Sequence, residues 1–390
     1  MVNSVDVRSV GQGSSTHDDP RTAARNCVGA ALAGRAPAPE DLVIVHPTIE
    51  YEPLAFFEAA AEAAAPAQLV GCTAYGGFTA AENVARGAVA LYVPAADLTF
   101  GIAAVDSISG DLRGAARRVT EAAREQAGGD AEHSVLVMLS DGLAGDQREV
   151  VRGSYAVTGA TVPMVGGAAA ENVTMSPTYQ FAHGKLMSNG LVAVWIDSPR
   201  PLGIGVAHGW HPIGDPMTVT RAEGNIIHEI DGRPAVDVYL TQRGGVADAG
   251  DASFARLTYD HPLGLANTSG AFDGRHILGR TDDGALIMFG HVSEQSVVQV
   301  LGGDHHDLVD AAGTAATTAA GMLDGPPRGA LVFSCTGRVA PLGEALREEP
   351  AAIDARLGGV PFAGFFTYGE FARVTGSTGF HNATVVVLAF

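Results

Sequence analysis

The residues of this chain that are best suited to covalent chemistry lie near its C-terminal end. Cys335 directly follows an apolar run, and His381 and Asn382 stand side by side further along the chain. A thiolate, an imidazole and an orienting amide are the parts of a cysteine nucleophile site. A cysteine also suits a small core position, and an asparagine can cap a turn. The sequence therefore names Cys335, His381 and Asn382 as candidate catalytic residues, without establishing that they are adjacent.

Two charged residues of the same region could bind a zwitterion. Arg338 follows the apolar run that ends at Cys335, and its planar guanidinium can hold a carboxylate by two parallel hydrogen bonds. Glu370 could accept an ammonium group. Together they would suit an amino acid. The alternative is a structural ion pair of Arg338 with Glu344 or Glu370.

Histidines raise the further alternative of a non-covalent haem, since haem needs an axial ligand in an apolar pocket. Spacing does not rank the candidates, and there is no CxxCH attachment motif. The adjacent His305 and His306 could touch a metal, but a solvated loop before a helix is the favoured interpretation. No metal site is predicted. The haem-ligand candidates are His208, His211, His261, His276, His291 and His381.

Polar residues follow three buried apolar runs, at the strand ends where open α/β sheets bind ligands. We expect His46, Ser140 and Ser334 to occupy equivalent places. Glycine-rich bends come after each run, and glycine lets the backbone approach a ligand closely. The predicted strand ends are 46–48, 140–142 and 334–338, and the bends are 71–77, 166–170 and 364–370.

These positions belong to a pattern that recurs three times. Each unit is read as an opening strand, a helix, a buried strand, a second helix, a strand that enters a bend, and a closing strand, which predicts mixed sheets covered by helices. The order is therefore β-α-β-α-β-β. Val7 to Gly13 opens the first unit and Val297 to Leu301 the third. The units span 5–96, 97–197 and 296–390.

A β-rich insertion interrupts the pattern at about 200–295. It contains the alternating runs 217–220 and 226–230, a turn at Asp231 and Gly232, and a helix that starts near Pro234. Residues 244–251 are read as a loop. A division into two domains, 1–198 and 199–390, follows from the pattern.

Composition excludes several classes of partner. The chain has 43 acidic against 24 basic residues and a net charge of −19, which disfavours nucleic acid and anionic membranes. No uncharged apolar run reaches the roughly 20 residues that span a bilayer. The three cysteines, Cys27, Cys72 and Cys335, have no paired spacing, so we expect reduced thiols. No secretory signal is visible, and a cytoplasmic protein is expected.

The motifs resemble the FIST family. Residues 330–338, 343–344, 361–370 and 380–384 are similar to the FIST C domain, and residues 140–142, 165–172 and 178–181 to the FIST N domain. Residues 230–235 fit the start of the C-terminal half. The resemblance implies a bacterial or archaeal sensory module that binds a small molecule such as an amino acid, and some relatives bind haem and nitric oxide. Both halves fill this chain, so a separate output protein would carry the signal.

The expected function is therefore small-ligand sensing, and the third unit is expected to supply most contacts. An enzyme that uses Cys335 with His381 is the alternative from another class. The residues expected to bind the ligand are Ser140, Asp141, Gly166, Gly167, Asn172, Cys335, Arg338, Tyr368, Gly369, Glu370, His381 and Asn382.

Overall fold

The computed structural model describes residues 9–129, 131–242, 251–266, 272–374 and 379–390. The fold is α/β with mixed sheets, as predicted from the alternation of apolar runs and helical segments. Val7 of the predicted first strand and most of the predicted loop 244–251 lie outside the described residues.

The first unit follows the predicted order of elements. Local sequence explains where its helices begin, because Asp19 accepts a hydrogen bond from the Thr22 amide and Glu52 accepts from the amides of Leu54 and Ala55, with a proline next in each case. The elements are β1 (Gly11–Ser15), α1 (Pro20–Leu32), β2 (Leu42–Pro47), α2 (Pro53–Ala64), β3 (Gln68–Cys72), β4 (Gly77–Thr79), β5 (Asn83–Val84) and β6 (Ala88–Val93).

The second and third units repeat this order. The second contains β7 (Thr99–Val105), α3 (Leu112–Ala127), β8 (His133–Asp141), α4 (Arg148–Thr158), β9 (Met164–Ala169), β10 (Tyr179–Ala182), β11 (Lys185–Ser188) and β12 (Leu191–Ser198). The third contains β13 (Gly203–Ala207), α7 (His305–Gly321), β23 (Ala330–Cys335), α8 (Val339–Leu342), α9 (Glu348–Leu357), β24 (Phe362–Thr367), β25 (Glu370–Arg373), β26 (Phe380–His381) and β27 (Val385–Ala389).

The opening strand of the third unit differs from the prediction. It is β13 and not Val297 to Leu301, which forms a strand of the insertion, so the insertion lies inside the third unit and not before it. The two glycines of β13 explain its weak apolar signal. Helix α7 lies so close that a Cβ on Gly203 or Gly205 would stand 1.9 or 1.7 Å from a helix carbonyl oxygen.

The three units are joined by exchange of hairpins. In each six-stranded sheet the opening strand pairs with the closing strand, followed by the buried strand and the strand that enters the bend. The last two strands come from another unit, so each unit gives one hairpin and receives one. The orders are β1-β6-β2-β3-β10-β11, β7-β12-β8-β9-β25-β26 and β13-β27-β23-β24-β4-β5.

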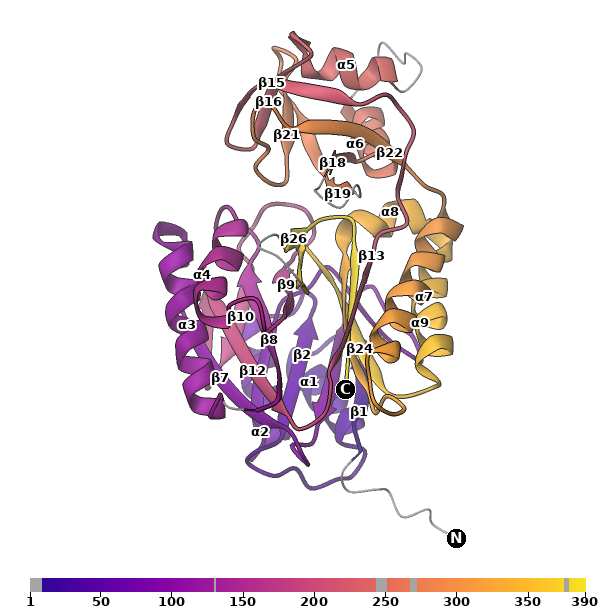
Figure 1. Cartoon of the computed structure of the whole chain (residues 1–390). Coiled ribbons are helices and arrows are strands. Elements are labelled where there is room, and N and C mark those ends of the chain that lie inside the picture. The colour runs from indigo at the N-terminus through magenta and orange to yellow at the C-terminus, as the bar shows by residue number, and fades with distance from the viewer. Residues whose placement is uncertain (1–8, 130, 243–250, 267–271, 375–378) are drawn as a thin grey trace.

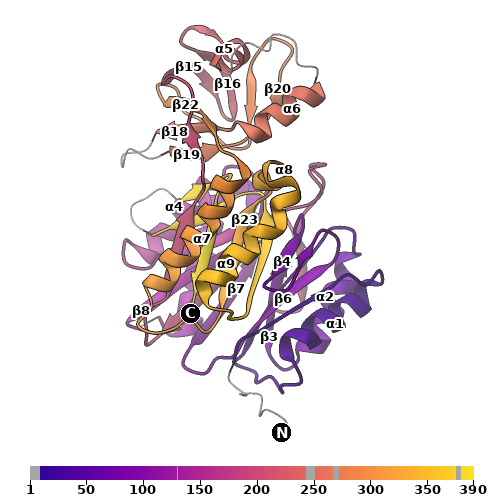
Figure 2. The ribbon, with the colours of Figure 1, turned by 90° about the vertical axis from the view of Figure 1, so that its right-hand side faces the viewer.

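The sheets surround a common core and carry their helices on the outside. One apolar cluster takes side chains from the inner faces of all three sheets, among them Val70, Val137 and Phe333. Separate clusters lie between each sheet and its helices. Figures 1 and 2 show the pairs α1–α2, α3–α4 and α7–α9 around this body.

The insertion forms a cap over one end of the body (Figure 1). It has its own apolar cluster, and the Trp210 indole donates a 2.8 Å hydrogen bond to the Ala383 carbonyl of the body. Among the described residues, no helix combines the length and apolar character needed to cross a bilayer. The cap contains β14 (His211–Pro212), β15 (Met217–Glu223), β16 (Ile226–Ile230), β17 (Arg233–Pro234), α5 (Ala235–Gln242), α6 (Asp251–Asp260), β18 (Leu263–Ala266), β19 (Phe272–Arg275), β20 (Ile277–Arg280), β21 (Leu286–Met288) and β22 (Val297–Gly302).

Candidate functional site

The strand registers define which residues are equivalent in the three units. In each unit, one residue of the buried strand pairs with the first residue of the closing strand. That residue of the buried strand serves as a common reference position. By this register His46 is not equivalent to Ser140 and Ser334, as the sequence suggested, but stands one residue earlier. Its imidazole stacks on Phe365, with 3.6 Å between ring centroids. The reference pairs are Pro47 with Ala88, Ser140 with Leu191 and Ser334 with Val385.

The next residue after each reference position is Thr48, Asp141 or Cys335. In the first unit the Thr48 hydroxyl accepts a hydrogen bond from the Gly87 amide at 3.1 Å. In the second unit the Asp141 carboxylate accepts from the amides of Leu143 and Asn189 at 2.8 and 2.7 Å. The side chain at this position therefore accepts hydrogen bonds from backbone amides in both units. In the second unit the acceptor is a carboxylate.

Cys335 occupies this place in the third unit, and its side chain is buried. The amides of Gly337 and Ala383 interact with its sulfur. These two residues correspond to Leu143 and Asn189 in position, and Ala383 and Asn189 share an unusual positive φ of 56° and 54°. Burial and the neighbouring carboxyl of Glu370 raise the pKa of the Cys335 thiol, while the two amides act in the opposite direction.

Glu370 neighbours Cys335 and is fully buried. Its carboxyl interacts with the thiol and accepts hydrogen bonds from the Thr367 hydroxyl at 2.5 Å and the Thr384 amide at 3.3 Å. Burial raises the pKa of Glu370 to about 8, although these partners favour the charged form. A carboxyl with such a pKa can both accept and return a proton near neutral pH.

A narrow pocket opens above the thiol, between the body and the cap. Its cavity volume is about 20 Å³, which is room for roughly one or two waters. A ligand of several atoms must therefore displace some of its walls. The body contributes Val173, Met175, Cys335, Thr336, Gly337, Tyr368 and Asn382, and the cap contributes Tyr259, His276, Leu278 and Phe289.

Asn382 supplies an unused hydrogen-bond acceptor to this pocket. Its side chain is buried, its Nδ2 donates to the Tyr368 carbonyl at 3.5 Å, and its Oδ1 has no hydrogen-bond partner among the described residues. Gly369 allows this packing, because a Cβ there would stand 2.3 Å from the Phe380 ring and 3.0 Å from Asn382 Nδ2. An unpaired buried acceptor is costly, so a ligand with an N–H or O–H group would be favoured here.

Tyr368 forms a wall of the pocket through its ring and not through its hydroxyl. The hydroxyl donates to the Glu171 carboxylate and accepts a hydrogen bond from the Val173 amide at 2.9 Å. Burial acts to raise the pKa of Glu171, but hydrogen bonds from Thr174, Tyr368 and Ser176 hold it below its usual range. This carboxylate therefore orders the segment that carries Val173 into the pocket wall.

Arg338 does not reach the pocket. Its side chain is fully buried and pairs with Glu349 at 2.6 Å, so the structural ion-pair alternative holds with a partner other than Glu344 or Glu370. Two more bonds run from its guanidinium to the carbonyls of His208 and Leu308, at 3.0 and 2.9 Å. The Arg338 guanidinium therefore links the segment that leads into the cap to the start of α7.

His381 lies along a different hollow from Cys335, together with His208 and Asp273. Its Nε2 is 3.1 Å from the Ala372 carbonyl oxygen, and its Nδ1 is 3.7 Å from Asp273. The structure thus separates the two members of the expected Cys335–His381 pair. Glu370 is the titratable group that meets the thiol instead.

Of the six haem-ligand candidates, His276 lines the pocket, where its ring centroid is 4.4 Å from that of Tyr259. Burial lowers the pKa of His276 to about 4, so its imidazole is neutral at pH 7. The pocket as it stands is too narrow for a porphyrin. Within the described part of the chain, no three His, Cys, Asp or Glu side chains form a metal-binding cluster.

The remaining predicted residues have structural surroundings. The Ser140 hydroxyl is fully buried, and Asn172 is exposed and donates to Glu50 at 3.0 Å. A Cβ on Gly166 would stand 2.0 Å from the Met138 carbonyl oxygen, and one on Gly167 would stand 2.4 Å from Thr367. These glycines therefore serve close packing of the strands.

The cap residues that line the pocket were not expected from the sequence, apart from His276 as a haem ligand. Tyr259 lies in α6 and Leu278 lies in β20, whereas Phe289 directly follows β21. No motif marks them. The one feature of the sequence that could have indicated them is the position of the insertion, which interrupts the repeat directly before the unit that carries most candidate site residues.

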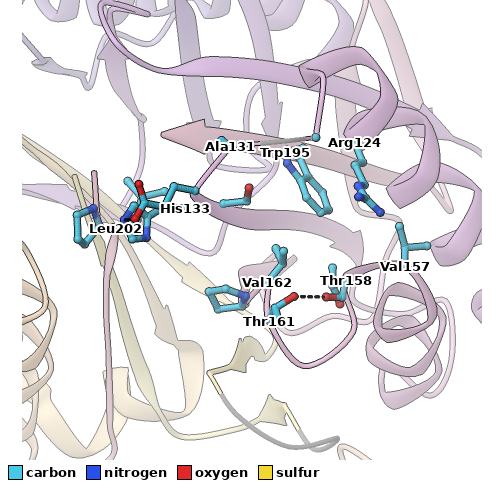
Figure 3. A pocket seen from close by; sticks show the side chains of 14 residues that line it. Arg124, Ala131, His133, Val157, Thr158, Thr161, Val162, Trp195 and Leu202 are labelled. Carbon is cyan, nitrogen blue, oxygen red and sulfur yellow. Dashed lines mark hydrogen bonds and ion pairs between the residues drawn. The ribbon is translucent and has the colours of Figure 1, made fainter. Parts of the chain in front are cut away.

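A larger hollow lies at the other end of the second unit (Figure 3). It is lined by Arg124 and Trp195, whose guanidinium and ring lie 5.8 Å apart, and by His133 at the start of β8. The Trp195 indole already donates to Asp197 at 2.6 Å. Because this hollow adjoins the start of β8 and not its carboxyl end, we place the candidate site at the pocket above Cys335.

Comparisons with known proteins agree with the resemblance seen in the sequence. The FIST N domain matches residues 41–233, and the FIST C domain matches residues 235–373. The uncharacterized protein Rv0628c of Mycobacterium tuberculosis is 30% identical over 396 residues, which cover 98% of this chain and 99% of that protein. The uncharacterized protein Mb0898c of Mycobacterium bovis is 29% identical over 242 residues, covering 58% and 60% of the two chains.

A crystal structure of a cyanuric acid hydrolase from A. caulinodans covers 98% of this chain and 99% of its own, with a TM-score of 0.36 and 10% identity. That similarity is too low to support an argument about function. FIST domains are generally assigned as small-ligand-binding sensory domains. On the two domain matches, which together cover most of its length, this chain is a member of the FIST family.

Proposed function

We propose that the protein is a cytoplasmic sensor of a small metabolite, of the size of an amino acid, which binds in the pocket above Cys335. The observation that carries the proposal is the composition of the pocket walls. Tyr259, Leu278 and Phe289 belong to the cap, whereas Tyr368 and Asn382 belong to the body. A ligand between them changes the free energy of one cap position relative to another, which is what a sensor requires.

The signal would then pass to a separate protein that distinguishes the cap positions. Arg338 no longer supports recognition of a ligand carboxylate, because Glu349 and two carbonyls occupy its donors. The ligand is instead held by apolar and aromatic side chains and by one hydrogen bond to Asn382. An uncharged metabolite, or an amino acid that presents an amide, fits this lining.

The test is a thermal-shift and calorimetry screen with the common amino acids and their amides. A pocket-blocking variant, Leu278→Trp, should abolish any stabilisation that the wild type shows. Val297→Trp is the matched control, because Val297 is also an exposed apolar residue of the cap but does not line the pocket. Equal responses of wild type and Leu278→Trp to every compound that binds would remove the proposal.

A further inference from the structure

The pocket combines a thiol, a proton acceptor and a pair of backbone amides. Cys335 lines it, the Glu370 carboxyl interacts with the thiol, and the amides of Gly337 and Ala383 interact with the sulfur. The equivalent amides of the second unit bind the Asp141 carboxylate. The third unit therefore retains this pair of amides but places a sulfur at the same position, and the amides oppose the rise in the pKa of the thiol that burial and Glu370 cause.

The unpartnered Asn382 Oδ1 is an independent sign that a ligand belongs here. Asn382 lines the same pocket as Cys335, and its Nδ2 donates to the Tyr368 carbonyl. A ligand that presents a hydrogen-bond donor next to Cys335 would satisfy this oxygen. An ester offers no such donor, whereas a primary carboxamide offers two N–H groups beside an electrophilic carbon.

The lining also restricts the charge of the ligand. Of the lining residues, only His276 could carry a positive charge, and burial favours its neutral form. The narrow space excludes a bulky ligand in this conformation. A small, uncharged, flat group meets all of these conditions.

We propose that Cys335 is a catalytic nucleophile toward a small carboxamide, with Glu370 as the proton acceptor and Asn382 as the acceptor of the amide N–H. The reactive form is the minor one in which Glu370 is ionised: the sulfur bonds to the carbonyl carbon as the S–H proton passes to the Glu370 carboxylate. The C–N bond then breaks, Glu370 returns the proton to the departing ammonia, and water hydrolyses the thioester to a carboxylic acid and the free thiol. This inference rests on the proposed function, because it uses the same pocket.

Iodoacetamide tests the arrangement directly, because it carries a primary amide and an alkylating carbon. Native protein is treated with it, and alkylation of each cysteine is followed by peptide mapping. Cys335 should react at least about tenfold faster than Cys27, a buried thiol without a carboxyl contact of this kind. The rate should saturate with iodoacetamide concentration, and acetamide should slow it. Unfolding the protein should remove the difference between the two thiols.

Three variants separate binding from reaction. Asn382→Ala should raise the iodoacetamide concentration that gives half the limiting rate. Glu370→Gln should lower the limiting rate and leave that concentration unchanged, which a merely structural effect would not do. Cys335→Ser should lose the fast labelling while acetamide still raises the melting temperature.

The outcomes distinguish this inference from the sensor proposal. If acetamide raises the melting temperature but Cys335 reacts no faster than Cys27, the ligand site stands and the nucleophile is refuted. If acetamide and the amino-acid amides neither bind nor protect, both proposals fall. Release of ammonia from acetamide, propionamide or benzamide by the wild type and not by Cys335→Ser would support amide cleavage, and its absence from all three would refute that step.

Discussion

Arg338 and Glu349 form an ion pair of 2.6 Å in which both side chains are fully buried. The pair joins the segment after β23 to the start of α9, and the same guanidinium reaches the carbonyls of His208 and Leu308. A buried ion pair returns little net stability when both members are present, but removal of one member leaves an uncompensated charge. Arg338 is thus a structural residue that stands next to the site.

The first prediction concerns this pair. Arg338→Leu should lower the free energy of unfolding by about 3–5 kcal/mol, because it leaves the Glu349 carboxylate buried without its partner. Denaturant unfolding measures the loss. The double variant Arg338→Leu/Glu349→Leu should be more stable than the single variant. The free energies of unfolding lost in Arg338→Leu and in Glu349→Leu are also measured separately. If the double variant lost the sum of these two values, the coupling between the two residues would be refuted.

The second prediction concerns Glu370 and pH. Burial raises its pKa in the folded protein to about 8, whereas the unfolded chain has the ordinary value. The folded state then retains a proton that the unfolded state loses, so this contribution to stability is complete below the unfolded pKa and declines as pH rises from about 4.5 to 8. Glu370→Gln should gain stability relative to the wild type across this window, by at most roughly 1.4 kcal/mol per pH unit.

Glu348→Gln is the control for that measurement, because Glu348 is an exposed glutamate of the same unit. Its difference from the wild type should not change systematically over the same pH range. A constant difference between wild type and Glu370→Gln from pH 5 to 8 would show that Glu370 is not held protonated by burial.

Sequence periodicity was sufficient to predict the units because each buried strand contains a continuous apolar run. These runs are Leu42–Val45, Val135–Leu139 and Ala330–Phe333, and each lies between helices. The hairpin exchange could not be predicted, because the partner of β4, β10 or β25 depends on how the units pack and not on the local sequence. The opening strand β13 was missed for a related reason, since its glycines serve contact with α7.

Only those residues of the site that lie at the ends of neighbouring strands could be predicted from the sequence. Cys335 ends β23 and Tyr368 follows the adjacent parallel strand β24, so the sheet itself places them near one another. His381 lies one residue from Asn382, but alternate residues of an extended segment face opposite ways, and it lines another hollow. The partner of Arg338 depended on the position of α9, which no local pattern specifies.

The third prediction concerns the contact between β13 and α7. Gly205→Ala would place a Cβ 1.7 Å from the Ala315 carbonyl oxygen, so strand and helix must separate. We expect a loss of about 1–3 kcal/mol, or more, in the free energy of unfolding. Gly279→Ala in β20 is the control, because a Cβ there meets no atom within 4 Å. Equal stability of the two variants would contradict the close approach.

The last prediction concerns His46, which lies at the centre of the body against Phe365. Its Nδ1 lies 3.2 Å from the Cys72 carbonyl oxygen, its Nε2 has no partner in the part of the chain that the structure describes, and burial lowers the pKa of His46 to about 3. The folded state therefore excludes a proton that the unfolded chain binds below about pH 6.5. The stability that depends on this neutral imidazole is complete above that pH and is lost as the pH falls toward 3.

His46→Phe should keep the stacked ring but remove this sensitivity to acid. The variant should lose the hydrogen bond to Cys72 at neutral pH, and its deficit relative to the wild type should shrink between pH 6.5 and 4, by at most roughly 1.4 kcal/mol per pH unit. Urea unfolding at a series of pH values measures this, with the exposed His305→Phe as the control. A deficit that stays constant in His46→Phe, or shrinks equally in His305→Phe, would mean that the central imidazole does not set the acid stability of the fold.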